Sequence, residues 1–425
     1  MIRSVRNGLA VGFVLLLCLQ NPAAGQSKAK RIDDLVKRFA EAGQFSGIVL
    51  AAEDGKVIYE KAFGWANADF RIANAKDTRI GIASITKLMT AVIRTRLVEE
   101  KHLSMDDKLS KSIPDFPDGD KITIEMLSSH RSGIPHRVMP AELESMPHSS
   151  AEMVEKIKRT PLLFEPGTKR LYSSAGYTVL ARVLEIASGK NYAELLREYV
   201  FAPAGMRDSL DFDGEKIIER RAQDYYLSPD GLINAGLKDY SFLVGAGSVF
   251  ATAGDLDRFA QAIVDGRYGE AAKARLLTGE TLAGSGSTNG HRLFIEIEKN
   301  KKWSYVVLSN LGAGSVDLIQ QGIRDIMVGK TAAAPAVVIP KILPNPASDL
   351  SQLLGKYRAA DGTENEVILR NGFLYAGDIK LYPTGPDCFF EYKFFGSPCF
   401  VRDAGGKVKE IQWKGSNFSL TFTKE

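Results

Sequence analysis

The 425-residue chain lacks the features that most readily assign a function. It has only three cysteines, and no histidines stand near them in the way a structural zinc site requires. Basic and acidic residues nearly balance at 55 and 51, and a net charge of +4 is too small over this length to indicate a nucleic-acid partner. With 44% hydrophobic and 25% charged residues, the composition is globular, which excludes a disordered, collagen-like or multi-span membrane protein.

Long apolar runs are also scarce, and the one candidate lies at the N-terminus. Arg3 and Arg6 precede an apolar stretch over residues 9–19, and residues 23–25 are small, as a cleavage site requires. The stretch is too short to span a bilayer comfortably, so we expect residues 1–25 to be a secretory signal peptide, with a retained anchor as the alternative. The mature protein would be exported, either periplasmic or secreted, and would meet the membrane only through this peptide.

Removal of the signal peptide leaves two cysteines, Cys388 and Cys399. An exported compartment permits a disulfide bond, and the two residues are close in sequence. We predict that they are bridged. Two free thiols remain the alternative, because a sequence gives no Cα separation.

Several motifs of other hydrolases and of nucleotide-binding proteins are missing. No Gly-x-Ser-x-Gly segment is present, which argues against an α/β-hydrolase. No His-Glu-x-x-His spacing is present, which argues against that type of metalloenzyme, and no phosphate-binding Gly-x-x-x-x-Gly-Lys-Ser/Thr loop occurs. We expect no metal or other cofactor.

The chain is long for one hydrophobic core, which stops growing at roughly 250–300 residues. Residues 331–347 contain four prolines, which prevent helix continuation and favour an extended linker. We therefore expect a main domain over residues 26–330 and a small antiparallel β domain over residues 348–425, in which Asn371-Gly372 marks a hairpin turn. Phe418, Leu420 and Phe422 alternate with polar residues, which predicts a half-buried strand.

Local patterns predict several elements of the main domain. The spacing of Ile32, Leu35, Val36 and Phe39 predicts an amphipathic opening helix. Residues 47–59 read as a hairpin with a turn at Asp54-Gly55. Further helices are predicted around residues 87–99, 176–187 and 318–327, and a buried strand over residues 303–309.

The first candidate for chemistry is the Ser-x-x-Lys pattern at Ser84 and Lys87. Apolar residues follow it, so Ser84 would begin a buried helix and Lys87 would lie one turn later on the same face. A lysine kept neutral by burial can take the proton of a serine nucleophile. The alternative is that Ser84 caps the helix and Lys87 is solvated. The same pattern at Ser27 and Lys30 stands in a polar context, and we assign it no function.

Further segments follow in a fixed order. They are Leu127-Ser128-Ser129-His130, Phe164-Glu165-Pro166-Gly167, Tyr172-Ser173-Ser174, Gly245-Ala246-Gly247-Ser248 and Thr252-Ala253-Gly254-Asp255-Leu256. In this order and spacing, the chain resembles the serine β-lactamase-related family over about residues 30–330. That family includes class C β-lactamases, D-Ala-D-Ala carboxypeptidases, D-aminopeptidases and certain esterases. The resemblance implies an α+β fold, an antiparallel sheet flanked by helices with an all-α lobe. The C-terminal region resembles the lipocalin-like β domains that often follow the catalytic domain of this family.

The resemblance also implies roles for individual residues. Ser84 matches the acylating nucleophile, Lys87 the lysine that assists its deprotonation, and Tyr172 the tyrosine that relays protons, although a packed core tyrosine is the alternative. Ser174 stands where the family has asparagine. The nearest match to the family's Lys-Thr-Gly or His-x-Gly motif begins at Gly284, so no cation stands there.

This strand segment continues through Ser285, Gly286 and Ser287. Alignment with the family implies that the backbone N–H groups of Ser287 and Ser84 form an oxyanion hole, with Ser174 and Ser285 beside the substrate. His291 could be a substitute base, but we predict a surface histidine on a strand.

These residues predict an exported serine hydrolase that acts on a small-molecule or peptide substrate. Without a cation at Gly284, an ester or unusual amide is favoured over a β-lactam or a D-amino-acid peptide, whose carboxylates need a partner. The alternative is a low-turnover, penicillin-binding-like sensor or binding protein on the same scaffold. We expect the C-terminal domain to be a stabilising appendage, with substrate gating or partner contact as the other possibility.

Overall fold

The computed structural model describes residues 26–332, 339–344, 349–360, 363–415 and 418–425. The predicted signal peptide lies outside the described residues, as do residues 333–338 and 345–348 of the predicted linker region. Within the described part of the chain, no helix has the length and apolarity needed to cross a membrane.

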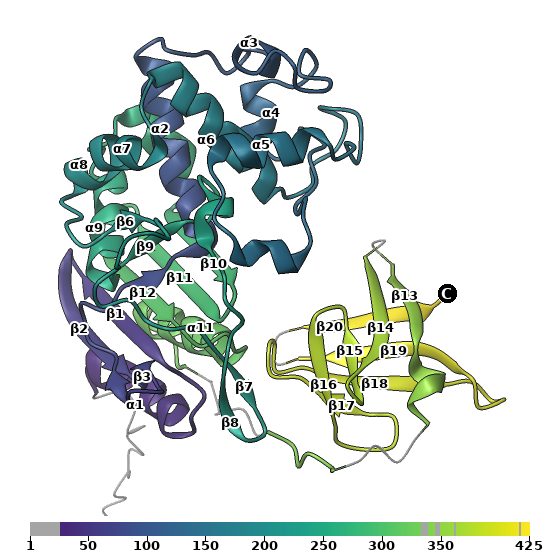
Figure 1. The fold of residues 1–425 in the computed structure, drawn as a ribbon. Helices are drawn as coiled ribbons and strands as arrows, with labels where there is room; N and C mark the ends of the chain where they lie inside the picture. Colours follow the sequence, from purple (N-terminus) through teal and green to yellow (C-terminus); the bar gives the residue numbers. More distant parts are fainter. Residues whose placement is uncertain (1–25, 333–338, 345–348, 361–362, 416–417) are drawn as a thin grey trace, which may run out of the picture.

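A five-stranded antiparallel sheet forms the centre of the main domain, with the strand order β10-β11-β12-β1-β2 (Figure 1). Its strands are β1 (Gly47–Glu53), β2 (Lys56–Phe63), β10 (Thr281–Thr288), β11 (His291–Glu298) and β12 (Trp303–Ser309). β1 pairs with β12 along its whole length, from Gly47 opposite Ser309 to Glu53 opposite Trp303, and so joins the two ends of the domain. A side chain at Gly47 would place its Cβ 1.9 Å from the carbonyl oxygen of Leu308, so this close pairing requires glycine.

Helices cover both faces of this sheet. Ile48 and Leu50 of β1 face the large core shared with the helical lobe and α9 (Ala253–Val264), whereas Val49 faces the opposite core. That second core is closed by α1 (Lys28–Glu41) and α11 (Ser315–Met327). The four residues that predicted the opening helix are all buried on α1, which confirms that prediction. β1 and β2 confirm the predicted hairpin, and β12 confirms the predicted buried strand.

The helical lobe occupies the upper part of Figure 1. It consists of η2 (Ala83–Ile85), α2 (Thr86–Glu99), α3 (Leu109–Ser112), α4 (Ile124–Ser128), η3 (Ala141–Ser145), α5 (Ser150–Lys158), α6 (Ser174–Ser188), α7 (Tyr192–Leu196), η4 (Arg197–Phe201) and α8 (Ala202–Ala204). The remaining elements of the main domain are β3 (Trp65–Asn67), β4 (Ile72–Ala73), β5 (Ile80–Gly81), β6 (Leu210–Asp211), β7 (Tyr225–Ser228), β8 (Gly231–Asn234), η5 (Tyr240–Leu243), β9 (Val249–Ala251) and α10 (Glu270–Leu276).

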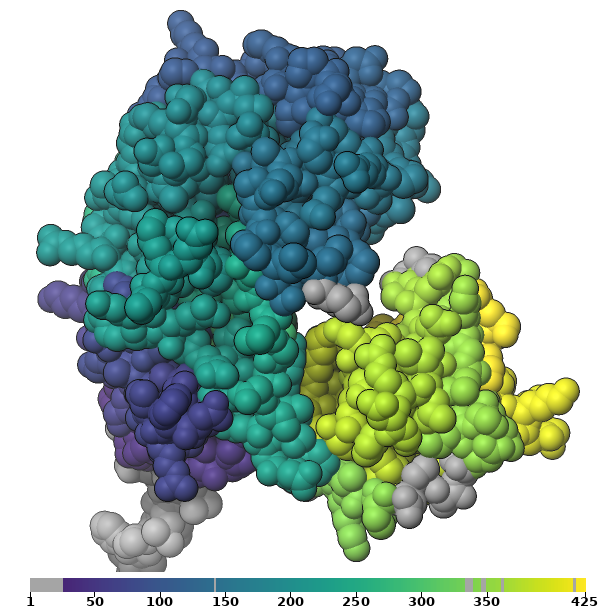
Figure 2. Space-filling model, viewed as in Figure 1, coloured from purple at the N-terminus to yellow at the C-terminus, as the bar shows by residue number. Residues whose placement is uncertain are grey.

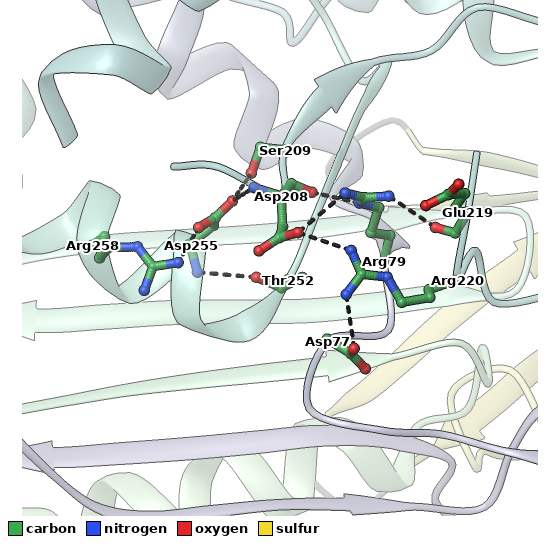
Figure 3. Close-up of polar contacts among 9 residues, drawn as sticks. All are labelled: Asp77, Arg79, Asp208, Ser209, Glu219, Arg220, Thr252, Asp255 and Arg258. Atoms are coloured by element: carbon green, nitrogen blue, oxygen red, sulfur yellow. Dashed lines mark hydrogen bonds and ion pairs between the residues drawn. The ribbon is translucent and has the colours of Figure 1, made fainter. Parts of the chain in front are cut away.

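A network of ion pairs fixes the segment that leads into η2 (Figure 3). Arg79 immediately precedes β5 and donates to the backbone oxygen of Asp208 at 2.8 Å and to its carboxylate at 3.1 Å. Arg220 donates to the same carboxylate at 2.9 Å. The fully buried carboxylate of Asp255 accepts the Asp208 N–H and the Ser209 hydroxyl, each at 2.8 Å. The network therefore ties β5, β6 and the start of α9 together.

The C-terminal region folds as an eight-stranded antiparallel sheet with the order β17-β16-β15-β14-β13-β20-β19-β18. Its elements are η6 (Leu350–Leu353), β13 (Gly355–Ala359), β14 (Glu364–Arg370), β15 (Phe373–Ala376), β16 (Ile379–Pro383), β17 (Phe389–Phe390), β18 (Ser397–Arg402), β19 (Val408–Lys414) and β20 (Ser419–Lys424). The disulfide bond between Cys388 and Cys399 joins its two edge strands, so the sheet is nearly closed. The predicted fold class and the predicted bridge are both confirmed.

Two strand predictions for this region have different outcomes. The hairpin at Asn371-Gly372 is confirmed, since both residues have the positive φ of a type I′ turn, 51° and 77°. The predicted burial pattern of β20 is wrong in part: Phe422 is buried, but Leu420 is 45% exposed. Leu420 pairs with Trp413 of β19 but does not belong to the buried cluster of this sheet, which takes only Phe422 and, in part, Phe418 from this segment.

The C-terminal sheet packs against the main domain next to the β7–β8 hairpin (Figure 2). The contact is a buried apolar cluster. It combines Tyr225, Leu227, Leu311 and Ala313 of the main domain with Tyr382, Phe390, Tyr392 and Phe395 of the C-terminal sheet. Buried aromatic pairs of this kind hold two bodies in a defined orientation.

Replacing both Cys388 and Cys399 by serine should lower the free energy of unfolding of the C-terminal sheet by about 3 kcal/mol, since the bond closes a loop with a sequence separation of 11. Urea unfolding followed by the fluorescence of Trp413, which is buried in this sheet, measures the change. Dithiothreitol should destabilise the wild type to the same extent and leave the double variant unaffected. Equal unfolding midpoints for the oxidised wild type and the variant would contradict the prediction.

Candidate active site

Ser84 lies in the short η2 turn between β5 and α2. The residue before it, Ala83, has a φ of 45°, in the left-handed region that costs a non-glycine residue of order 1 kcal/mol. Ile85 occupies the N-cap position of α2, so Ser84 does not cap that helix. The strained turn instead directs the Ser84 hydroxyl toward side chains of the helical lobe.

Lys87 lies in the first turn of α2 with only 6% of its surface exposed. Its Nζ donates to the hydroxyls of Ser84 and Ser174, each at 3.2 Å, and to the carbonyl oxygen of Ala246 at 2.7 Å. No carboxylate contacts it among the described residues. Burial therefore lowers the pKa of Lys87 to about 7, so near neutral pH a large fraction of the amine is uncharged. The alternative of a solvated lysine is wrong.

Tyr172 stands just before α6 and contacts Ser84. Its hydroxyl donates to the Ser84 oxygen at 2.7 Å, and its ring lies 4.9 Å from the Nζ of Lys87. Loss of hydration raises the pKa of the Tyr172 phenol, although the ring itself is partly exposed. The phenol is thus protonated at neutral pH, and Ser84 accepts hydrogen bonds from both Tyr172 and Lys87.

Two histidines that sequence reasoning left without a role support this arrangement. Nδ1 of His130 accepts the N–H of Ser173 at 3.2 Å, and Nδ1 of His136 accepts the N–H of Ser174 at 3.1 Å. Burial lowers the pKa of both imidazoles to about 4, so both are neutral at pH 7. They orient the segment that follows Tyr172. The segments are 38 or more residues apart in sequence, so no spacing rule could have paired them.

The edge strand β10 forms the facing wall. Ser285 and Ser287 line the same cavity as Ser84, Tyr172 and Ser174, which has a volume of about 390 Å³. A Cβ on Gly286 would lie 2.6 Å from the carbonyl oxygen of Ile82, so only glycine lets β10 approach the nucleophile turn this closely. Five of the six predicted site residues therefore line one cavity, and the sixth, Lys87, is buried behind it and contacts Ser84 and Ser174.

Residues 32–303 match the family model described as Beta-lactamase. The chain belongs to the β-lactamase family. A penicillin-binding protein of Bacillus subtilis (strain 168) is 28% identical over 86% of this chain and 92% of its own length. The teichoic acid D-alanine hydrolase of Staphylococcus aureus (strain MRSA252) is 26% identical over 54% of this chain and 56% of its own length.

The fold also matches solved structures. The D-amino acid amidase of Ochrobactrum anthropi SV3 superposes with a TM-score of 0.64 over 71% of this chain and 99% of the amidase, at 20% identity. The family match and the two sequence relatives support serine-hydrolase-type chemistry in general, and the amidase shows the shared fold.

Two positions differ from the family's pattern or from our prediction. A Cβ on Gly284 would lie 2.9 Å from Cδ1 of Leu88 and 3.2 Å from Ile295, so apolar side chains already occupy the space beside this position. The prediction that His291 is a surface residue is wrong: it is fully buried, stacks on Tyr240, and its Nε2 lies 2.5 Å from a carboxylate oxygen of Asp224. His291 is absent from the lining of the Ser84 cavity.

Among the described residues, no group of three or more histidine, cysteine, aspartate or glutamate side chains could hold a metal ion. The groups that contact the Ser84 oxygen are instead the phenol of Tyr172 and the amine of Lys87, which suits proton transfer and nucleophilic attack.

Replacing Lys87 by methionine should stabilise the fold most at low pH. The amine has a pKa of about 7 in the folded chain and 10.5 in the unfolded chain, so below pH 7 folding must bury a charge. Between pH 7 and 10.5 the unfolded chain binds more protons, and wild-type stability should rise by about 1.4 kcal/mol per pH unit relative to the variant.

Urea unfolding of wild type and Lys87→Met at pH 6 and pH 9 measures this difference. The exposed Lys356 of β13 supplies the control, since Lys356→Met should change stability equally at both values. A Lys87→Met effect that is the same at pH 6 and pH 9 would refute the low pKa.

Proposed function

We propose that the protein is an exported serine hydrolase that cleaves an ester or amide through an acyl-enzyme on Ser84. One observation carries the proposal: the Ser84 oxygen lies 2.7 Å from a protonated phenol and 3.2 Å from a buried amine whose pKa is about 7. A base with a pKa near the working pH is the most effective at taking a proton from a nucleophile.

The chemistry follows from these positions. Neutral Lys87 takes the Ser84 proton as the oxygen attacks the substrate carbonyl carbon, and the carbonyl electrons move onto the oxygen. The backbone N–H groups of Ser84 and Ser287 stabilise this oxyanion. Tyr172 passes a proton to the leaving group as the bond to carbon breaks, and it is reprotonated from Lys87. Water then attacks the acyl-enzyme by the same route and regenerates Ser84. The scheme requires no cofactor.

Ser174 and Ser285 complete the site as positioning and substrate-contact groups. The Ser174 hydroxyl accepts from Lys87 at 3.2 Å, and this contact aims the amine between Ser84 and Ser174. Serine offers a shorter reach than the asparagine of the family's pattern, so Ser174 holds the base rather than extending to a substrate. Ser285 faces the cavity from the exposed side of β10.

An ester or unusual amide is the preferred substrate. The space beside Gly284 is filled by Leu88 and Ile295, so this strand position supplies no cation to bind the carboxylate of a β-lactam or a D-Ala-terminated peptide. The relatives include an enzyme named for D-alanine removal from teichoic acid and one named for D-amino acid amides, which supports a substrate of either bond type.

Export is part of the proposal. It rests on the positively charged, apolar and small-residue segments of residues 1–25, which together make a signal peptide. Nothing in the charge balance favours nucleic acid as a partner.

A fluorophosphonate probe should label wild-type protein at Ser84, because the probe reacts with activated serines. Ser84→Ala should abolish labelling, and Lys87→Ala should slow it at least 100-fold through loss of the base, on the order expected for general-base catalysis. Ser27→Ala is the matched control: it removes the other Ser-x-x-Lys serine, which only caps α1, and labelling should be unchanged. An unlabelled wild type, or undiminished labelling of Ser84→Ala, would refute the proposal.

Hydrolysis of nitrocefin, 4-nitrophenyl esters and D-amino-acid amides should separate the substrate classes. We expect esters to be turned over fastest and nitrocefin slowest, because no cation adjoins Ser84 on the Gly284 side. Rapid nitrocefin turnover would overturn this preference. Intact mass measurement of the acyl-enzyme tests the sensor alternative, since an adduct that persists for hours would favour sensing over turnover.

A further inference from the structure

A second cavity, of about 330 Å³, continues from the Ser84 cavity toward the C-terminal sheet. The two cavities share six lining residues: Arg137, Glu144, Lys238, Ser287, Thr288 and Arg292. The far wall of the second cavity is formed by Asp378, Lys393 and Phe394 of the C-terminal sheet. We call the second cavity the inter-domain groove. It begins at β10, directly beside the predicted oxyanion hole, and ends on the other domain.

The wall supplied by the C-terminal sheet is held in place. The Glu391 carboxylate is fully buried and accepts the N–H of Phe394 at 2.9 Å and that of Gly396 at 2.7 Å. The Phe394 backbone packs so closely on Gly314 of the main domain that a Cβ on this glycine would lie 2.4 Å from it. The adjoining apolar cluster fixes the same region. The groove is therefore a preformed site rather than a gap between loosely linked domains.

The groove is lined by four cationic and two anionic side chains, an excess of positive charge. Three of the cations have acidic partners: Lys238 lies 2.6 Å from Glu144, Lys393 lies 3.0 Å from Asp378, and Arg292 pairs with Asp317. Among the described residues, nothing hydrogen-bonds to or ion-pairs with the guanidinium of Arg137, although its charge interacts at longer range with the Asp378 carboxylate. Arg137 lines both cavities, so its charge is available at their junction.

We propose that the inter-domain groove is a subsite for an anionic group, a phosphate or a carboxylate, that the substrate carries at a distance from the bond cleaved at Ser84. An arginine fork binds either oxyanion through two parallel hydrogen bonds. The identification of the ligand as substrate rests on the proposed function, since the groove opens into the Ser84 cavity. The C-terminal sheet is then part of the binding site and more than an appendage.

Binding can be measured without catalysis. Calorimetric titration of Ser84→Ala protein with hexyl phosphate, hexanoate and hexanol should show binding of one or both anions and none of the alcohol. The double variant Ser84→Ala, Arg137→Gln should bind the anions about tenfold more weakly, as expected for loss of a charge-assisted hydrogen bond. Arg159→Gln, an equal charge change at the exposed end of α5 on the same lobe, is the matched control and should have no effect. The relative affinities of phosphate and carboxylate identify the preferred group.

Substrate turnover tests whether the C-terminal sheet contributes to the same subsite. Butyryl thioesters of 6-mercaptohexyl phosphate and of 6-mercaptohexanol differ only in the distant charge. Wild type should prefer the anionic thioester, and Lys393→Gln should lower the ratio of the two kcat/KM values by leaving Asp378 unpaired in the groove. The exposed Lys356→Gln of the same sheet should leave the ratio unchanged.

Absence of anion binding to Ser84→Ala, or binding that Arg137→Gln does not weaken, would overturn the proposed subsite. Failure of the proposed function gives a different result. In that case wild type takes no fluorophosphonate label and hydrolyses neither thioester, while hexyl phosphate still binds and still depends on Arg137.

Discussion

The site depends on the burial of one amine. Lys87 has no acidic partner among the described residues and is surrounded by hydroxyls and a carbonyl oxygen, so its neutral form is favoured by loss of water alone. An acidic neighbour would raise its pKa and remove its capacity to accept a proton. The surrounding structure therefore has to exclude both water and carboxylates from Lys87 while keeping its Nζ within reach of Ser84.

Local sequence patterns predicted the parts of the fold that depend on interactions between residues close in sequence. The apolar spacing of α1, the Asp54-Gly55 and Asn371-Gly372 turns and the buried strand β12 all form as predicted, because periodicity and turn geometry decide them. The proximity of Ser84 and Lys87 follows in the same way from helical spacing. Tyr172, Ser174 and β10 are far from Ser84 and Lys87 in sequence. We expected them to lie near these two residues only because the order of the segments resembles a known family.

Other features could not be predicted from the sequence. His291 follows a turn on a strand next to polar residues, a setting typical of a surface histidine, yet Tyr240 of η5 and Phe250 of β9 pack on it and Asp224 contacts its imidazole. Leu420 alternates correctly for a half-buried strand, but burial depends on contacts with other strands, and of β20 only Phe422 is buried in the cluster. The roles of His130 and His136 depend on backbone N–H groups of Ser173 and Ser174, and no residue pattern reports such contacts.

The missing cation at Gly284 and the unpaired cation at Arg137 have a common explanation. A charge on β10 beside the nucleophile would bind an anion adjoining the bond that is cleaved, but Leu88 and Ile295 close that space. Arg137 offers a charge at the junction of the Ser84 cavity and the inter-domain groove. In the proposed scheme, an anionic group of the substrate binds there and not beside the reacting carbonyl. The groups around Ser84 would then perform acyl transfer alone, and selectivity would depend on the junction between the two domains.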